Sequence, residues 1–120
     1  MSIIARTAAK AFAAGNRFSR CHTVCDGPSL VFHGTEIALR RGENIYLTPR
    51  GFGTQSTFVR LNAVIAALGG AGHFHRAKGE IIFSHPPSGA TWVIGPRDAV
   101  VIRLGLALPI IYREWIKEED

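Results

Sequence analysis

Hydrophobic side chains recur at intervals of three and four residues in two segments of the chain, which is the spacing of one helix face. The first segment carries Ile3, Ile4, Ala8, Ala11 and Phe12 before the Gly15-Asn16 pair. It is rich in alanine, a strong helix former, and glycine commonly follows a helix end. The spacing predicts a short amphipathic helix over residues 3–14, which needs another element to pack against.

The second segment lies between Pro49 and Gly70. Its apolar face consists of Phe58, Leu61, Val64, Ile65 and Leu68. Thr54 or Ser56 can accept the first free helical N–H groups as an N-cap, and Gly69-Gly70 ends the run. We predict a core-facing helix of about twelve residues. Arg60 and Asn62 lie beyond opposite edges of this face, so neither needs to be buried, and Asn62 is expected to fasten a neighbouring backbone group.

Between these helices the pattern changes to short β-prone runs. TVC, SLVFH, EIALR and NIYLT are separated by DGP, GT and RGEN, which are turn sequences at hairpin spacing. This order predicts an antiparallel β-meander of three or four strands over residues 23–48.

Beyond the second helix, GHFHRAKGEIIFSH predicts a hairpin that turns at AKGE. A PPSG turn, a strand at ATWVI and a strand over residues 98–104 follow. Pro109 suits the first turn of a final short helix that would place Ile111, Tyr112 and Trp115 toward the body. The predicted fold class is α+β: an N-terminal helix, an antiparallel meander, a central amphipathic helix packed on the sheet, and a C-terminal hairpin, strands and short helix.

The length of 120 residues suits one domain over residues 1–120, with the acidic tail 114–120 less ordered than the rest. The longest apolar runs are far shorter than the roughly 20 residues that cross a bilayer. Arg6 and Lys10 interrupt the apolar N-terminal stretch and argue against a secretory signal. We expect a cytoplasmic protein, with Cys21 and Cys25 as free thiols.

The net charge of +5 is unevenly distributed. Residues 1–113 carry thirteen Lys or Arg against five Asp or Glu, a net charge of +8, whereas residues 114–120 have a net charge of −3. Eleven of the fourteen cations are arginines, which bind phosphates and carboxylates through two parallel hydrogen bonds. A basic body excludes a DNA mimic. The alternative interpretation is an ordinary solvated surface.

Five histidines and two cysteines raise the question of a metal site. His73 and His75 would share one face of a strand, but CHTVC and HFH do not have the spacing of structural zinc ligands. GFGTQST lacks the spacing and the lysine of a phosphate-binding P-loop, and no G-x-S-x-G motif is present. Acidic residues do not cluster. We therefore expect no metal, no cofactor and no catalytic residues, and a protein that is not an enzyme.

Two sets of residues carry a resemblance. Val31 to Gly34 (VFHG) precedes Ile37-Ala38, and a second set follows with Gly51, Phe52, Thr54, Ser56, Thr57, Arg60, Leu61 and Asn62. This arrangement resembles a widespread group of small phage and prophage accessory proteins, over roughly residues 5–85, with departures after about Val93. The resemblance implies a phage origin. Many small phage accessory proteins work by stoichiometric binding to a host defence complex, as anti-CRISPR proteins do.

The leading hypothesis is a non-enzymatic phage accessory protein that binds and inhibits a host protein or nucleoprotein complex. The predicted contacts are Arg17, Arg20, Arg40, Arg41, Arg50 and Arg60. One alternative is a small basic regulator that binds nucleic acid directly, because cations alternate with Phe18 and Phe52. Another is a structural or assembly role, with self-association through Trp92, Tyr112 and Trp115.

Overall fold

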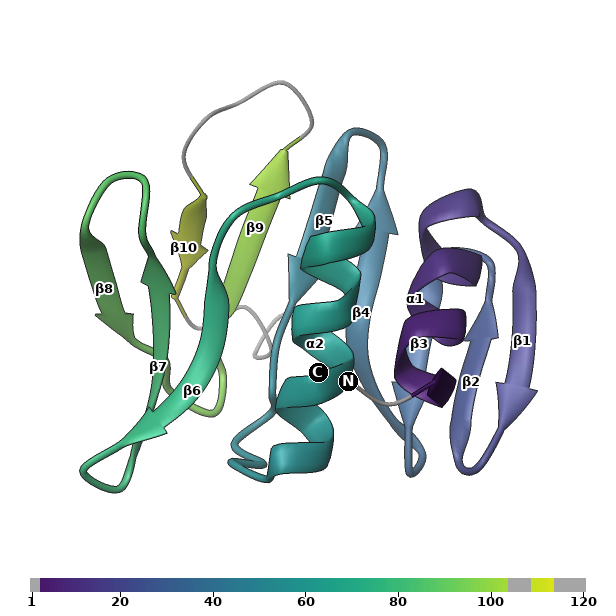
Figure 1. Ribbon diagram of the computed structural model, residues 1–120, viewed down its shortest axis with the longest axis horizontal. Coiled ribbons are helices and arrows are strands. Elements are labelled where there is room, and N and C mark those ends of the chain that lie inside the picture. The colour runs from purple at the N-terminus through teal and green to yellow at the C-terminus, as the bar shows by residue number, and fades with distance from the viewer. Residues whose placement is uncertain (1–2, 104–108, 114–120) are drawn as a thin grey trace.

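The computed structural model describes residues 3–103 and 109–113. Two helices pack on one face of a seven-stranded antiparallel sheet. A separate three-stranded sheet lies beside the second helix, on the side away from the first helix (Figure 1). The predicted α+β class is confirmed. Neither described helix has the length and apolar character needed to cross a membrane.

The first half of the chain forms a helix and five consecutive strands. Helix α1 (Ile3–Ala14) has the predicted bounds. The strands are β1 (Arg17–Arg20), β2 (Thr23–Asp26), β3 (Ser29–Phe32), β4 (Thr35–Arg41) and β5 (Asn44–Leu47). The predicted meander is therefore confirmed as β2 to β5, whereas β1 was not predicted. Strand β1 is short and has one inward hydrophobic residue, Phe18, which lies opposite the buried Cys25.

The central helix α2 (Gln55–Ala67) matches the prediction closely. Thr54 is its N-cap, and its hydroxyl accepts the Thr57 N–H at 3.3 Å. At the other end, the Leu68 N–H donates to the Val64 carbonyl at 3.0 Å, and Gly69 adopts a φ of 73°. The left-handed backbone at Gly69 favours glycine and ends the helix there.

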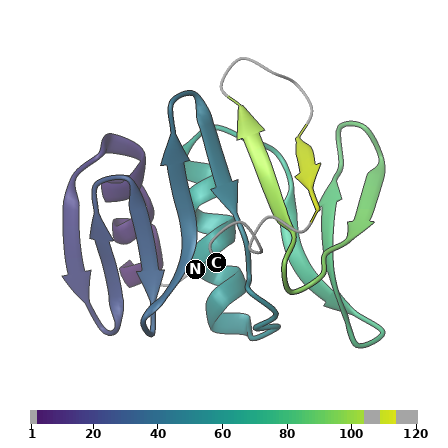
Figure 2. The same ribbon diagram turned by 180° about the vertical axis from the view of Figure 1, so that it is seen from behind.

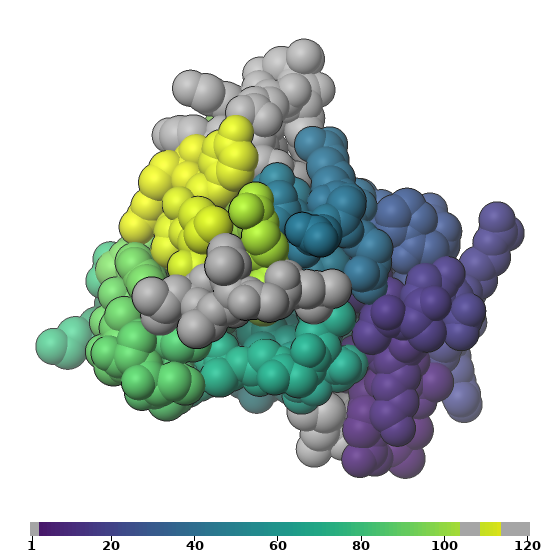
Figure 3. All heavy atoms as spheres, turned by 90° about the horizontal axis from the view of Figure 1, so that it is seen from above, coloured from purple at the N-terminus to yellow at the C-terminus, as the bar shows by residue number. Residues whose placement is uncertain are grey.

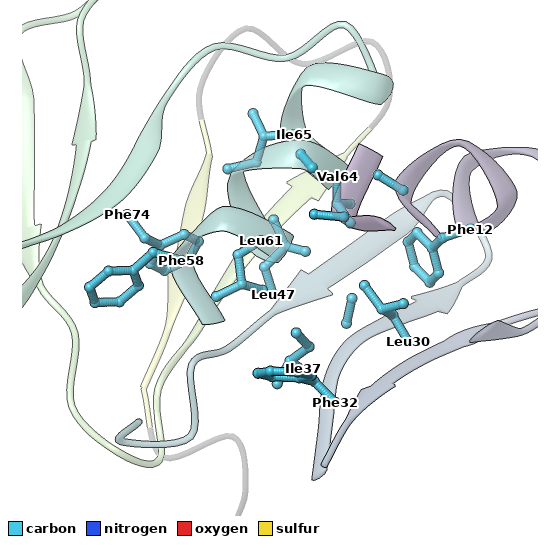
Figure 4. Close-up of a cluster of buried hydrophobic side chains, with 14 of the residues drawn as sticks. Phe12, Leu30, Phe32, Ile37, Leu47, Phe58, Leu61, Val64, Ile65 and Phe74 are labelled. Carbon is cyan, nitrogen blue, oxygen red and sulfur yellow. The ribbon is translucent and has the colours of Figure 1, made fainter. Parts of the chain in front are cut away.

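The two helices cover different parts of the sheet. Phe12 of α1 packs near Leu30 of β3, and Leu61 of α2 packs near Leu47 of β5, and all four are almost fully buried (Figure 4). Val64 and Ile65 continue the buried face of α2, as the spacing predicts. The meander and both helices therefore share one hydrophobic core.

The C-terminal part divides between the two sheets. Strands β6 (His73–Ala77), β7 (Glu80–His85) and β8 (Ala90–Val93) form the three-stranded sheet. The three strands were predicted, but not that they form a sheet of their own. Strand β9 (Ala99–Arg103) returns to the large sheet and pairs with β5 in the register Leu47↔Val100.

The predicted final helix after Pro109 is wrong, because the described residues there form strand β10 (Ile110–Tyr112). Ile111 pairs with Val100 of β9. Two isoleucines and a tyrosine have high β-propensity, and β9 offers them a free row of backbone partners. Ile111 still packs against the core, as expected, but from a strand. The predicted tail, including Trp115, lies outside the described residues.

The view from behind shows the face of the large sheet that neither helix covers (Figure 2). The strand order is β1-β2-β3-β4-β5-β9-β10, so β1 is an end strand of this sheet. In the space-filling view, the purple N-terminal segments lie at the opposite end of the molecule from the green strands β6 to β8 (Figure 3).

Candidate partner-binding surface

Two of the six predicted contact arginines lie on the end strand. Arg17 and Arg20 are the first and last residues of β1, and both are exposed. Neither side chain makes a hydrogen bond or ion pair with any residue that the structure describes. Asp26 lies opposite Arg17 in the β1–β2 register, but their charged groups do not form an ion pair. Both guanidinium groups are therefore free to bind an external anion.

The adjacent pair Arg40-Arg41 divides between the two faces of β4. Arg41 is exposed at the end of the strand, and its side chain has no hydrogen-bond partner within the described residues. Arg40 faces the helices. Its Nη2 donates to the carbonyls of Phe12 at 3.3 Å and Ala13 at 3.1 Å, and its guanidinium lies 5.6 Å from the Phe12 ring centre. Arg40 thus satisfies carbonyls at the C-terminus of α1, where a positive charge is favourable.

Arg50 is also engaged within the chain. Its Nε donates to the Glu36 carbonyl at 3.0 Å, and its Nη2 lies 4.0 Å from the Glu36 carboxylate. Its φ of 56° places it in the left-handed region, immediately before Gly51. The side chain therefore fastens the loop before α2 to strand β4.

Arg60 differs most from its prediction. The expectation that it lies beyond the buried face of α2 is wrong, because only 9% of the residue is exposed. Its Nε donates to the Thr23 hydroxyl at 2.8 Å, its Nη1 donates to the Ser56 carbonyl at 3.0 Å, and its guanidinium lies 3.9 Å from the Phe32 ring centre. Burial lowers the pKa of Arg60, against an opposing contribution from Cys21.

The burial of Arg60 has a geometric cause. The neighbouring strands β2 and β3 present a hydroxyl at Thr23 and an aromatic face at Phe32 to this side of α2. These groups can hold a guanidinium inside the protein through a hydrogen bond and a cation–π contact. Helical periodicity locates the residue on α2 but gives no information about which strands lie beside it.

Asn62 has the role that the sequence predicted. Its Nδ2 donates to the Phe74 carbonyl at 3.1 Å, and its Oδ1 accepts the Phe74 N–H at 2.7 Å. One side chain thus satisfies both backbone groups of a residue in β6. Asn62 connects α2 to the three-stranded sheet and is not available for a ligand.

The comparisons with known proteins give one result. The chain matches the sequence model described as Kyanoviridae Gp96 protein over residues 1–96. The chain belongs to the Kyanoviridae Gp96 protein family. The comparisons with curated proteins and with solved structures gave no match.

Membership of the Kyanoviridae Gp96 family confirms that this is a phage protein, as the resemblance implied. The matched residues include both helices and strands β1 to β8. Strands β9 and β10 lie beyond them. All six predicted contact arginines are within the matched part.

The two motif segments of this Kyanoviridae Gp96 protein meet in space. A hollow of about 340 Å³ at the N-terminus of α2 is lined by Phe32, His33, Thr35, Ile37, Phe52, Thr54 and Thr57. No lysine or arginine lines it, and the Thr54 hydroxyl is occupied by the Thr57 N–H and hydroxyl. Phe52 at the hollow is 53% exposed. The hollow therefore suits an uncharged, apolar group, and sequence reasoning did not identify it because its two walls are far apart in the chain.

The histidines of this Kyanoviridae Gp96 protein form two separate pairs. The rings of His73 and His75 lie 4.9 Å apart on one face of β6, as predicted, and the rings of His22 and His33 stack at 4.6 Å. Over residues 3–103 and 109–113, no three His, Cys, Asp or Glu side chains converge in a way that could hold a metal ion.

Both cysteines are free thiols, as expected, and their environments differ. Cys21 is exposed in the β1–β2 turn. Cys25 is buried, and its thiol donates to the Asn16 carbonyl at 3.2 Å. Burial raises the pKa of Cys25, with an opposing effect from the Gly27 backbone and a smaller addition from the Asp26 carboxylate.

The aromatic residues predicted for self-association lie in different sheets. Trp92 is on β8, where its ring stacks 6.0 Å from that of the buried Phe83. Tyr112 is on β10, 37% exposed, with its ring 6.3 Å from that of Tyr46. Trp115 lies outside the described residues.

Proposed function

We propose that this Kyanoviridae Gp96 protein is a non-enzymatic phage accessory protein that binds and inhibits a host macromolecule in the host cytoplasm. A host-defence nucleoprotein complex, of the kind that anti-CRISPR proteins bind, is the proposed target. The observation that supports this function is the free state of Arg17, Arg20 and Arg41. All three are exposed, and none is paired with a described residue.

The contrast with the other arginines strengthens the proposal. Arg40, Arg50 and Arg60 donate hydrogen bonds to groups of the chain itself, so the predicted set of six contacts is reduced to three. The charge distribution favours the same region. Residues 1–25 contain four Lys or Arg and no Asp or Glu. A region of one sign attracts a partner of the opposite sign and accelerates its association.

A second candidate function is direct binding of nucleic acid. It is favoured by Phe52, which is 53% exposed and could stack on an unpaired base. The lining of the neighbouring hollow contains no cation, however, and most of the affinity for nucleic acid comes from lysine and arginine contacts to phosphates. An acidic protein surface is therefore the preferred partner.

The test compares two charge-reversal variants of the full chain. R17E/R20E/R41E changes the three free arginines of the predicted set, and R76E/K78E/R97E changes three other exposed cations outside residues 1–25. Each substitution changes the charge by −2, so both variants fall from +5 to −1. Tagged wild type and variants are used to capture binding partners from host lysate at low salt, with and without nuclease.

We expect the first variant to capture at least about ten-fold less host protein than wild type. The control variant should capture an amount within about two-fold of wild type. Equal losses in both variants would show that only net charge matters and would reject the proposed contacts. Capture that disappears with nuclease would favour the nucleic-acid function. Retention by both variants would contradict the proposal.

A further inference from the structure

Strand β1 ends the seven-stranded sheet, and its outer edge has no neighbouring strand among the described residues (Figures 1 and 2). An end strand presents a row of backbone N–H and C=O groups that can pair with an added strand. Charged side chains on such an edge commonly prevent unwanted pairing. The question is therefore which partner the charges of β1 exclude and which they allow.

The turn geometry identifies the backbone groups that face outward. Cys21 and His22 form a two-residue turn, with φ values of 50° and 61°, as expected for a type I′ hairpin. Arg20 and Thr23 close this turn, and Phe18 lies opposite Cys25. In an antiparallel ladder, hydrogen-bonded pairs alternate with non-bonded ones. The N–H and C=O groups of Phe18 and Arg20 therefore face β2, and those of Arg17 and Ser19 face the free edge.

We propose that the β1 edge accepts an extended, acidic segment of the partner protein as an additional strand. The Arg17 and Ser19 backbone groups would form the ladder. Arg17 and Arg20 lie on opposite faces of β1, so each guanidinium group would bind carboxylates on its own face of the added segment. This inference rests on the proposed function, because it assigns a binding geometry to two of its three arginines.

Charge decides between the possible occupants. A second copy of the chain, paired antiparallel through β1, would place Arg17 opposite either Arg17 or Ser19 of the copy. In both registers the two Arg17 side chains are direct or diagonal neighbours, and like charges this close are destabilising. Nucleic-acid phosphates can accept from the N–H groups but offer no donors to the Arg17 and Ser19 carbonyls. An acidic peptide segment satisfies the N–H groups, the carbonyls and the arginines together.

A shallow hollow at the same edge provides space for side chains of the added strand. It has a volume of about 380 Å³ and is lined by Arg17, Phe18, Ser19, Val24, Cys25 and Asp26. Val24 is 39% exposed there and Phe18 is half-buried. Asp26 is the one carboxylate in the lining, against two arginines on the strand. A segment that alternates acidic and apolar residues fits this edge in two ways: its acidic face binds Arg17 while its apolar face contacts Phe18, or its acidic face binds Arg20 while its apolar face contacts Val24.

The probe is a blocked peptide of four Glu-Val repeats, followed by amide NMR of the full chain. Saturable shifts centred on Arg17 and Ser19 are expected at peptide concentrations up to about 1 mM. A Lys-Val peptide tests charge. A Glu-Val peptide with an N-methyl group on every residue keeps the charge but has no backbone N–H donors. Neither control peptide should shift these amides.

A backbone variant tests the ladder itself. Ser19→Pro removes one outward N–H and no bond to β2, and end strands tolerate proline at such positions. It should weaken Glu-Val binding by about ten-fold, whereas Ser19→Val, which keeps the N–H, should bind within about two-fold of wild type. Shifts located elsewhere, no shifts, or equal effects of the Glu-Val and N-methylated peptides would overturn the inference even if Ser19→Pro failed to fold.

The proposed function and the strand-addition proposal can be rejected independently of each other. If R17E/R20E/R41E loses the host protein and Ser19→Pro retains it fully, the proposed function stands and strand addition is rejected. If the Glu-Val peptide binds at β1 but no host protein depends on the three arginines, strand addition stands as a property of the edge and the proposed function is rejected.

Discussion

The interior around α2 and the edge formed by β1 use the same kinds of polar side chain in opposite ways. Arg60 and Cys25 are buried and bonded to the chain, whereas Arg17, Arg20 and Cys21 are exposed. A buried polar group must find its partner within the protein, and an exposed one can leave its bonding capacity to water or to another molecule. Residue type alone therefore does not identify a recognition residue; its surroundings do.

Arg60→Ala should have the largest effect on the interior. It leaves a cavity, the Thr23 hydroxyl without its donor and the Phe32 face without its cation, and we expect a loss of about 3 kcal/mol in unfolding free energy. Urea denaturation measures this loss. Arg60→Met is the control, because it fills the space and removes the desolvation cost of the charge, so its loss should be below about 1.5 kcal/mol.

The same pair of variants tests whether Arg60 is only structural. If Arg60→Met is stable but no longer captures the host protein, Arg60 belongs to the recognition surface, and the division between interior and edge is wrong.

Asn62→Ala should lower the free energy of unfolding, measured by urea denaturation, by about 2 kcal/mol, because both the N–H and the carbonyl of Phe74 lose their partner. Asn44 provides a matched control, since its amide oxygen accepts from Arg103 at 2.8 Å in an exposed bond. Asn44→Ala should change stability by less than about 0.5 kcal/mol. Equal losses in the two variants would show that burial does not determine the strength of these bonds.

These predictions also show how far the sequence could be interpreted. Both helices, the four-stranded meander and the hairpin follow from local periodicity and turn residues, and the Asn62 contact follows from its place beside the apolar face. Strand β10 could not be predicted, because Ile110–Tyr112 becomes a strand by pairing with β9. The inward turn of Arg40 and the burial of Arg60 depend on α1, β2 and β3, which are distant in the chain.

The two cysteines allow the comparison between interior and edge to be tested by changing the pH. The pKa of Cys25 is raised in the folded protein, so the folded state holds this proton more tightly than the unfolded chain does. Its contribution to stability is present below the ordinary thiol pKa of about 8.5 and is lost as the pH rises through the folded value.

The measurement is the urea midpoint at neutral and at alkaline pH. Cys25→Ala should reduce the loss of stability seen for wild type between these conditions. Cys21→Ala, at the exposed position, should leave that loss unchanged. A reduction of the same size in both variants would mean that the buried thiol is not its source.

Arg17→Ala and Arg20→Ala together should have the smallest effect on folding. Both side chains are exposed and unpaired with described residues, so the unfolding free energy should change by less than about 0.5 kcal/mol. Host-protein capture by this double variant should nevertheless fall. A loss of stability comparable with that of Arg60→Ala would place these arginines among the interior groups.

The family match ends at residue 96, just before β9, yet β9 occupies the position beside β5 in the large sheet. The backbone along Asn44–Leu47 is thus shielded by a strand outside the shared sequence. A relative that has only the matched part must protect that side of β5 by other means, such as a different C-terminal extension or a neighbouring molecule.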